Sequence, residues 1–269
     1  MIVQSAADGA EHFVITMDQH TALSAQFAEH FGNDNFEAVE PRSLMLHVIE
    51  HHDAGWKELD ALALRDPATG LPYNLVKTPL AHIVATSSAS PDFNSECHPY
   101  CELISSMHSW GLYNGRYGMS DKVLLDSLVD DNRTEAEAML EGEIERQERL
   151  KAQLKSDPET ASLTEESTLF QNYKQLQFFD TFALYFNCVQ ESDREKASFS
   201  HIPLDASKDT EITIEPVEAG VYALDPYPFG RNDIELSFNG RYLASIAEGD
   251  DVREELERSP ITSQSMRLV

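Results

Sequence analysis

Hydrophobic side chains recur at three- and four-residue steps along most of the chain before Glu191, which is the spacing of amphipathic α-helices. The strongest pattern of this kind covers residues 165–189, where the second half of the predicted helix is apolar nearly all round. A more acidic helix is predicted to begin at a capping box formed by Thr134 and Glu137. The pattern predicts helices over residues 17–31, 43–52, 80–87, 99–113, 134–154 and 165–189.

After Glu191 apolar and polar side chains alternate, and this pattern predicts β-strands. Asn239-Gly240, between two such runs, is typical of a hairpin turn. Two short apolar runs within residues 1–16 also predict a hairpin, which we expect to join the same sheet. The predicted C-terminal strands cover residues 211–217, 220–224, 233–238 and 241–244. We therefore expect a mostly α fold, with a helical bundle and a small antiparallel β-sheet formed by the C-terminal strands and the N-terminal hairpin.

The same pattern predicts one domain over residues 1–246. Within it, residues 121–166 are the most acidic part of the chain, and we expect a helical insertion that packs through one narrow face. Residues 247–269 are acidic and then polar, so we expect this tail to be loosely held.

Composition restricts the class of partner without identifying a reaction. The 269 residues include 47 Asp and Glu against 20 Lys and Arg, so the formal net charge is -27. This excess of negative charge argues against nucleic acid and against anionic membrane surfaces as partners. Three cysteines do not make a disulfide framework, the N-terminus lacks the pattern of a signal peptide, and no apolar run has the length of a membrane helix. We expect a cytoplasmic protein that acts on a small-molecule substrate.

The densest group of reactive side chains lies at residues 47–56, in the run His-Val-Ile-Glu-His-His-Asp-Ala-Gly-Trp. The adjacent His52 and Asp53, at the end of a predicted helix, can give a metal ion two ligands from one rigid element. Imidazole nitrogen and carboxylate oxygen together suit zinc, iron or manganese. The alternative is a polar helix end whose histidines contact only solvent or the helix dipole.

Isolated polar residues also interrupt apolar helix faces elsewhere in the chain. His20 and His108 each lie within an apolar stripe, where a single histidine is more often a hydrogen-bonded core residue than a ligand. Asp180 lies on a predicted helix whose second half is apolar nearly all round. Burial of an unpaired carboxylate is costly or forces its protonation. Asp180 therefore requires a cation, a network of hydrogen-bond donors or a metal.

The order of these residues along the chain, His20, then His52-Asp53, then His108, then Asp180, resembles that of the HD superfamily of helical metalloproteins. The resemblance implies an HD-like helical bundle that binds one or two divalent ions of iron, manganese or zinc. A narrower resemblance covers nearly the whole chain, to an uncharacterised bacterial family of domains of unknown function that is considered HD-like. It rests on short segments in a shared order: Asp18-Gln19-His20, His52-Asp53-Ala54-Gly55-Trp56, Ser106-Met107-His108, Leu112-Tyr113, Gln177-Phe178-Phe179-Asp180 and Asp225-Pro226-Tyr227-Pro228-Phe229.

The HD resemblance also implies a set of site residues. Extra histidines on neighbouring helices allow a second ion. Glu50, close to the His-Asp doublet on the same predicted helix, is a candidate general base, although the position also suits an ordinary surface glutamate. The implied metal ligands are His20, His52, Asp53, His108 and Asp180, with His51, His82 and His98 as further or alternative ligands.

Three functions follow from these expectations. The leading one is a metal-dependent hydrolase, and in most HD-like proteins a phosphohydrolase, in which a metal-bound water attacks the substrate. The second is an HD-like di-iron oxygenase, in which His108 with His98 or His82 holds the second iron. The third is a non-catalytic binding or regulatory module, in which the same residues form a buried polar network without a metal. The first function needs cations that bind phosphate, and the cations near the implied ligands in sequence are Arg42, Lys57, Arg116 and Lys174.

Overall fold

The computed structural model describes residues 1–128 and 130–269 of the chain. Helices account for 51% of the residues and strands for 19%. The helices are α1 (Met17–His30), α2 (Arg42–Glu50), α3 (Lys57–Leu62), α4 (Leu80–Ser95), α5 (Pro99–Tyr113), α6 (Gly115–Gly118), α7 (Asp130–Lys155), α8 (Glu166–Cys188) and α9 (Val252–Arg258). The strands are β1 (Ile2–Val3), β2 (His12–Ile15), β3 (Ala197–Asp205), β4 (Lys208–Glu218), β5 (Val221–Asp225), β6 (Ile234–Leu243) and β7 (Thr262–Leu268).

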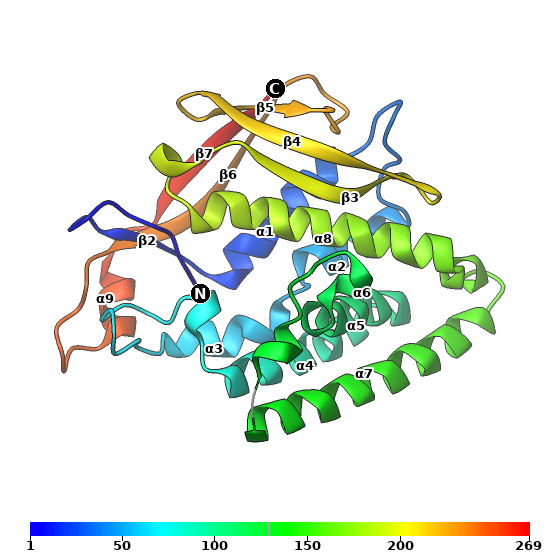
Figure 1. The fold of residues 1–269 in the computed structure, drawn as a ribbon, viewed down its shortest axis with the longest axis horizontal. Coiled ribbons are helices and arrows are strands. Elements are labelled where there is room, and N and C mark those ends of the chain that lie inside the picture. The colour runs from blue at the N-terminus through cyan, green and yellow to red at the C-terminus, as the bar shows by residue number, and fades with distance from the viewer. Residues whose placement is uncertain (129) are drawn as a thin grey trace.

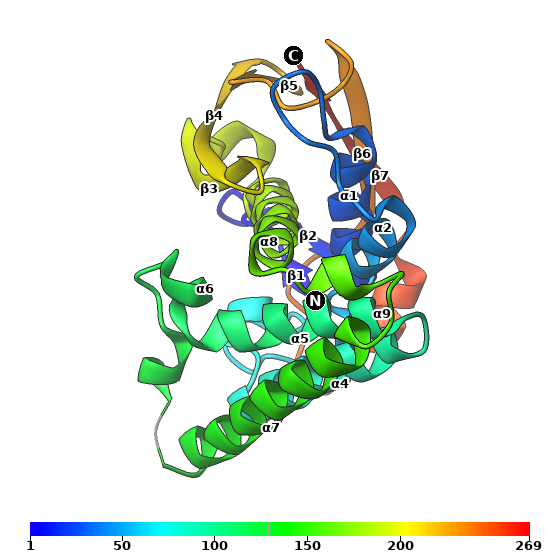
Figure 2. The same ribbon diagram turned by 90° about the vertical axis from the view of Figure 1, so that its right-hand side faces the viewer.

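The seven strands of the described residues form one sheet in the order β1-β2-β6-β7-β5-β4-β3. Neighbouring strands are antiparallel except β5 and β7, which pair in parallel. The sheet curls around α1 and α8, which pack on its inner face (Figures 1 and 2). The fold is therefore α/β with a curled, mixed sheet. The expectation of a mostly α, HD-like bundle with a small antiparallel sheet is wrong.

Two strands that the hydrophobic pattern does not predict account for this difference. β7 lies in the middle of the sheet and pairs with both β6 and β5. Only Met266 and Leu268 of β7 are buried, so its alternation is short. Residues 247–269, where the sequence predicts a loosely held tail, therefore contain α9 and a central strand. In β3, a register shift between Phe199 and Ile202 interrupts the alternation.

α4, α5 and α7 pack together on the side of α8 opposite the sheet (Figures 1 and 2). The acidic helix α7 lies along α5 and α4 at the edge of the molecule. Its buried side chains recur at intervals of three or four residues, so this helix contacts its neighbours through one stripe. They are Ala136, Leu140, Glu143, Gln147, Leu150 and Leu154. Among the described residues, no helix combines the length and the apolar composition that crossing a bilayer requires.

α8 lies between the sheet and the helical layer, and most of its length is enclosed. Phe179, Phe182 and Phe186 have no solvent exposure. Because the helix is surrounded, the polar side chains of Gln177 and Asp180 are buried as well, at 6% and 4% exposure. Buried polar groups need hydrogen-bond or charge partners, and for these two residues the partners come from other helices.

Candidate metal centre

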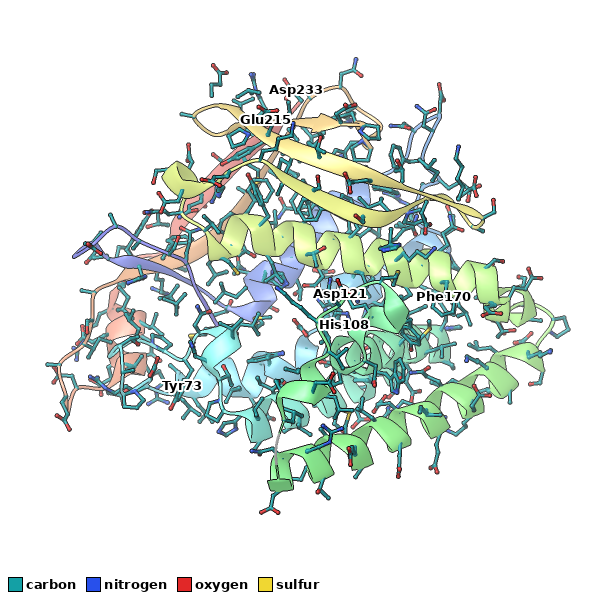
Figure 3. All side chains as sticks on the ribbon, viewed as in Figure 1. Tyr73, His108, Asp121, Phe170, Glu215 and Asp233 are labelled. Atoms are coloured by element: carbon teal, nitrogen blue, oxygen red, sulfur yellow. The ribbon has the colours of Figure 1, made fainter. Side chains whose placement is uncertain are left out.

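Four helical segments bring three histidines and two carboxylates together in the interior. His20 comes from α1, His108 from α5 and Asp180 from α8, while His52 and Asp53 follow the end of α2. His20 and His52 have no exposure, and Figure 3 shows His108 in the middle of the molecule below α8. The ligand atoms of His20, His52 and Asp53 lie within 4.8 Å of one another, and so do those of His52, His108 and Asp180. We call these five residues the His-Asp cluster.

The turn after α2 fixes the His-Asp doublet in place. His51 leaves the helical region with φ -125° and ψ 17°. A short 3-10 turn then covers Ala54–Trp56 and packs against α4. A Cβ at Gly55 would lie 2.2 Å from the backbone oxygen of Thr86 in α4. The glycine that follows the doublet is therefore needed for the close approach of the two backbones.

Hydrogen bonds on the outer ring nitrogen orient the histidines. His52 Nδ1 lies 2.7 Å from the carbonyl oxygen of Ile49. A carbonyl oxygen can only accept, so His52 Nδ1 carries a proton. His20 Nδ1 pairs in the same way with Oδ1 of Asn187, at 2.9 Å. Both rings then direct Nε2 at the carboxylates, which is the arrangement of metal-binding histidines whose second nitrogen is held by an outer partner.

His108 is held by an amide side chain. Its Nδ1 contacts the amide of Gln177, one turn before Asp180 on α8. In the structure the Nε2 group of Gln177 faces Nδ1. Exchange of the two ends of the amide places Oε1 there instead, and Nδ1 then donates as the other two rings do. The other end of the Gln177 amide has no hydrogen-bond partner among the described residues. The Nε2 atom of His108 is then left for the cluster.

The spacing of the ligand atoms fits a metal ion. His20 Nε2 is 3.2 Å from Asp180 Oδ1, and His52 Nε2 is 3.8 Å from the same oxygen and 3.7 Å from Asp53 Oδ2. Two ligands that bind a tetrahedral ion at about 2.1 Å are about 3.4 Å apart. His52 Nε2 is buried and has no hydrogen-bond partner in the described part of the chain. A bound ion would give this atom a partner.

The charges of the cluster favour a cation. Burial lowers the pKa of His52, but Asp53 and Asp180 outweigh burial and raise this pKa to about 9. Burial, helped by the charge of His52, lowers the pKa of His108 to about 3. Burial tends to raise the pKa of Asp180, but interactions with His20 and His52 hold it well below its ordinary value. At neutral pH the cluster thus has an anionic Asp180 and a proton on His52 that a divalent ion would displace.

A family model for proteins of unknown function, DUF3891, matches residues 1–245. The chain belongs to this family. The match spans the whole His-Asp cluster and ends before α9 and β7. No curated protein and no solved structure matches the chain. The resemblance to an uncharacterised family of unknown function is therefore confirmed, whereas none of these comparisons shows a relation to the HD superfamily.

The other residues implied by sequence lie outside the cluster of this DUF3891 protein. The His51 ring stacks on Phe93, and His98 caps the start of α5. His82 is half-buried near the start of α4, and Glu50 is exposed at the end of α2. Neither group of possible metal ligands within the described residues includes any of them. The structure thus brings together the five principal candidate ligands and leaves the four additional candidates elsewhere.

Arg116 approaches the cluster from a left-handed turn. Its Nη2 lies 3.8 Å from Oδ2 of Asp180. Arg116 and Tyr117 have φ values of 51° and 57°, between Gly115 and Gly118, whose φ values are also positive. This conformation costs roughly 1–2 kcal/mol for each residue that is not glycine, so the surrounding contacts must hold it. Helical and strand periodicities give no indication of such a turn, and the two glycines are its only mark in the sequence.

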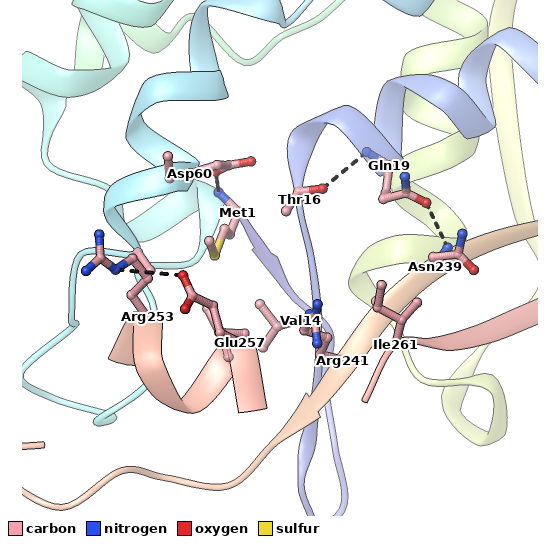
Figure 4. Close-up of a pocket in the computed structure, with 14 residues that line it drawn as sticks. Met1, Val14, Thr16, Gln19, Asp60, Asn239, Arg241, Arg253, Glu257 and Ile261 are labelled. Atoms are coloured by element: carbon pink, nitrogen blue, oxygen red, sulfur yellow. Dashed lines mark hydrogen bonds and ion pairs between the residues drawn. The ribbon is translucent and has the colours of Figure 1, made fainter. Parts of the chain in front are cut away.

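A pocket of about 310 Å³ opens beside Arg116, between α8 and β3. Its walls include Arg116, Ser120, Lys174, Gln177, Thr181 and His201. Because Gln177 also contacts His108, this pocket borders the cluster. A larger pocket of about 550 Å³ lies where α3, α9, β2 and β6 meet, and none of its lining residues belongs to the cluster (Figure 4). We call the smaller one the Arg116 pocket.

Proposed function

We propose that this protein is a metal-dependent hydrolase that acts on a small-molecule phosphoester and binds its ion in the His-Asp cluster. One observation carries the proposal. The buried Nε2 of His52 faces carboxylate oxygens of Asp53 and Asp180 at 3.7 and 3.8 Å, and it has no hydrogen-bond partner within the described residues. A divalent ion bound by imidazole and carboxylate satisfies the nitrogen and neutralises the buried negative charge.

The geometry favours one ion bound through His52. Its Nδ1 is bonded to Ile49, so only Nε2 is free. The two groups of possible ligands share His52. Because a single free nitrogen binds one ion, the two groups do not each hold a separate ion through His52. One ion on His52 and Asp180, completed by other members of the cluster, agrees with both groups. The di-iron alternative needs His98 or His82 beside His108, and neither of these two histidines lies in the cluster, so the geometry gives it no support.

A bound divalent ion lowers the pKa of its water ligand and so supplies a nucleophile at neutral pH. Arg116 supports a phosphoester as the substrate. Its side chain is 26% exposed and its Nη2 is 3.8 Å from Asp180, so it can reach both the cluster and a ligand in the adjoining pocket. Guanidinium pairs with phosphate oxygens through two parallel hydrogen bonds. Arg116 therefore supplies the cation that a phosphate site beside the cluster requires.

Metal analysis of protein purified without added metal or chelator tests the proposal. We expect about one equivalent of zinc, iron or manganese. We also expect hydrolysis of p-nitrophenyl phosphate or of bis(p-nitrophenyl) phosphate, lost on chelation and restored by the same metal. His52→Gln should lose both metal and activity. His51→Gln is the matched control, because His51 is adjacent in sequence and stacks on Phe93 outside the cluster.

Three outcomes contradict parts of the proposal. No metal after reconstitution would support a binding module with a buried polar network. Equal metal content in His52→Gln and His51→Gln would place the ion elsewhere. A protein that holds metal in the cluster but hydrolyses neither ester would remove the hydrolase assignment.

A further inference from the structure

The Arg116 pocket is lined without carboxylates in a chain that is rich in them. Asp and Glu together number 47 of the 269 residues. None of the described residues that line this pocket is Asp or Glu, whereas four other pockets each include at least one. Arg116, Lys174 and His201 are in the walls instead. The pocket is therefore suited to an anion.

Lys174 places a second cation away from the cluster. It precedes Asp180 by six residues on α8, a distance of about 9 Å along the helix axis. Its Nζ donates to the two oxygens of Asp209 at 2.7 and 2.8 Å. An ammonium group has three N–H donors, so one remains for a ligand. Asp209 thus holds Lys174 in position without using all of its donors.

His201 reaches the same pocket from β3. Its φ of 61° lies in the left-handed region, at the register shift between Phe199 and Ile202. Irregularities of this kind change the direction of a side chain relative to the regular strand. A further nitrogen donor therefore lies in the pocket wall, contributed by the sheet opposite α8.

Gln177 connects the pocket to the cluster. One end of its amide contacts His108, and the other end has no partner among the described residues although the side chain is only 6% exposed. As placed, the unpaired atom is the amide oxygen; with the two ends of the amide exchanged, Oε1 accepts from His108 and the Nε2 group is left to donate to an anionic ligand. Gln177 and Arg116 are thus the groups that a ligand meets beside the cluster, and Lys174 and His201 are those it meets further away.

We propose that the substrate carries a second anionic group, a carboxylate or a second phosphate, which Lys174 and His201 bind in the Arg116 pocket. The reacting group then lies beside Arg116 and Gln177. A volume of about 310 Å³ and an axial spacing of about 9 Å suit a compact metabolite with two anionic ends. The inference rests on the proposed function for the reacting end, while the preference for a second anion can be measured separately.

Isothermal titration of the metal-loaded protein with three phosphonates of equal chain length tests this preference. Butylphosphonate has one anionic end, 4-phosphonobutyrate adds a carboxylate, and propane-1,3-diphosphonate adds a second phosphonate. We expect at least one of the two-ended ligands to bind about tenfold more tightly than butylphosphonate, the gain of one charge-assisted hydrogen bond. The tighter of the two identifies the second group. Lys174→Gln should remove the gain without changing the affinity for butylphosphonate, and Lys174→Arg should keep most of it.

Lys196→Gln is the matched control, because Lys196 also pairs with a carboxylate, Glu215 at 3.3 Å, but does not line the pocket. Equal affinity of the wild type for all three ligands overturns the inference and leaves the proposed function standing. If Lys174→Gln still binds a two-ended ligand more tightly than butylphosphonate, this result also overturns the inference and leaves the proposed function standing. Failure to bind any phosphonate also overturns the inference, and if the protein holds no metal either, the proposed function fails with it.

Discussion

Metal binding by this protein should depend steeply on pH, because the ion competes with a proton. Burial lowers the pKa of His52, but Asp53 and Asp180 raise it to about 9 in the metal-free protein. A metal binds only the unprotonated Nε2. Below pH 9 each decrease of one pH unit therefore weakens the apparent affinity for the metal about tenfold, or about 1.4 kcal/mol. Between pH 9 and pH 7 the loss is about 100-fold, and above pH 9 the contribution of His52 levels off.

Competition with a chromophoric chelator of known affinity measures the apparent Kd at each pH. Calorimetry in two buffers of different ionisation enthalpy counts the protons released, and we expect about one for each ion bound near pH 7. His52→Gln, which should be purified without metal, should show at most weak binding on titration and no dependence on pH in this range. An affinity that stays constant from pH 7 to pH 9, or binding without proton release, would refute the reasoning, since His52 would then be unprotonated or not a ligand.

Two further predictions concern the turns that hold the site. Gly55→Ala places a Cβ 2.2 Å from the Thr86 backbone oxygen and should lower the free energy of unfolding by about 1–3 kcal/mol. Gly142→Ala, with nothing within 4 Å, should raise it by up to about 1 kcal/mol. Urea denaturation measures both, and a Gly55→Ala protein as stable as wild type would contradict the close approach of the backbones. Arg116→Gln should lower kcat/KM for p-nitrophenyl phosphate about 10- to 100-fold with unchanged metal content. The exposed control Arg231→Gln should have no effect, and equal activity of the two variants would exclude Arg116 from the site.

The cluster could be predicted from sequence because its members differ chemically from their surroundings. Asp180 is a carboxylate on an apolar helix, and the adjacency of His52 and Asp53 is visible without any structure. The groups that orient the histidines were not predictable in the same way. Asn187 and Gln177 are ordinary polar residues. Each contacts a histidine only because α8 packs against α1 and α5, which places Asn187 opposite His20 and Gln177 opposite His108.

The sheet was harder to predict because its pairing is not local. β7 has the sequence Thr-Ser-Gln-Ser-Met-Arg-Leu, in which only the last few positions alternate in hydrophobicity. Its place between β5 and β6 depends on contacts far apart in the chain. The position of Arg116 was also not predictable from periodicity, because it lies in a left-handed turn and such a turn has no periodic pattern. Periodicity predicted most of the helices of this protein but not the arrangement of its strands.

The place of β7 in the sheet has a consequence for the order in which the protein assembles. β5 and β6 are consecutive in the chain, yet β7 separates them in the sheet. During synthesis both strands emerge from the ribosome before the strand that joins them, and each exposes an unpaired edge in the meantime. Such edges favour aggregation, and pairing over long sequence separations is slow. Because α1 and α8 pack on this sheet and supply His20 and Asp180, the nascent chain completes the residues of the His-Asp cluster long before it completes the scaffold that holds them together.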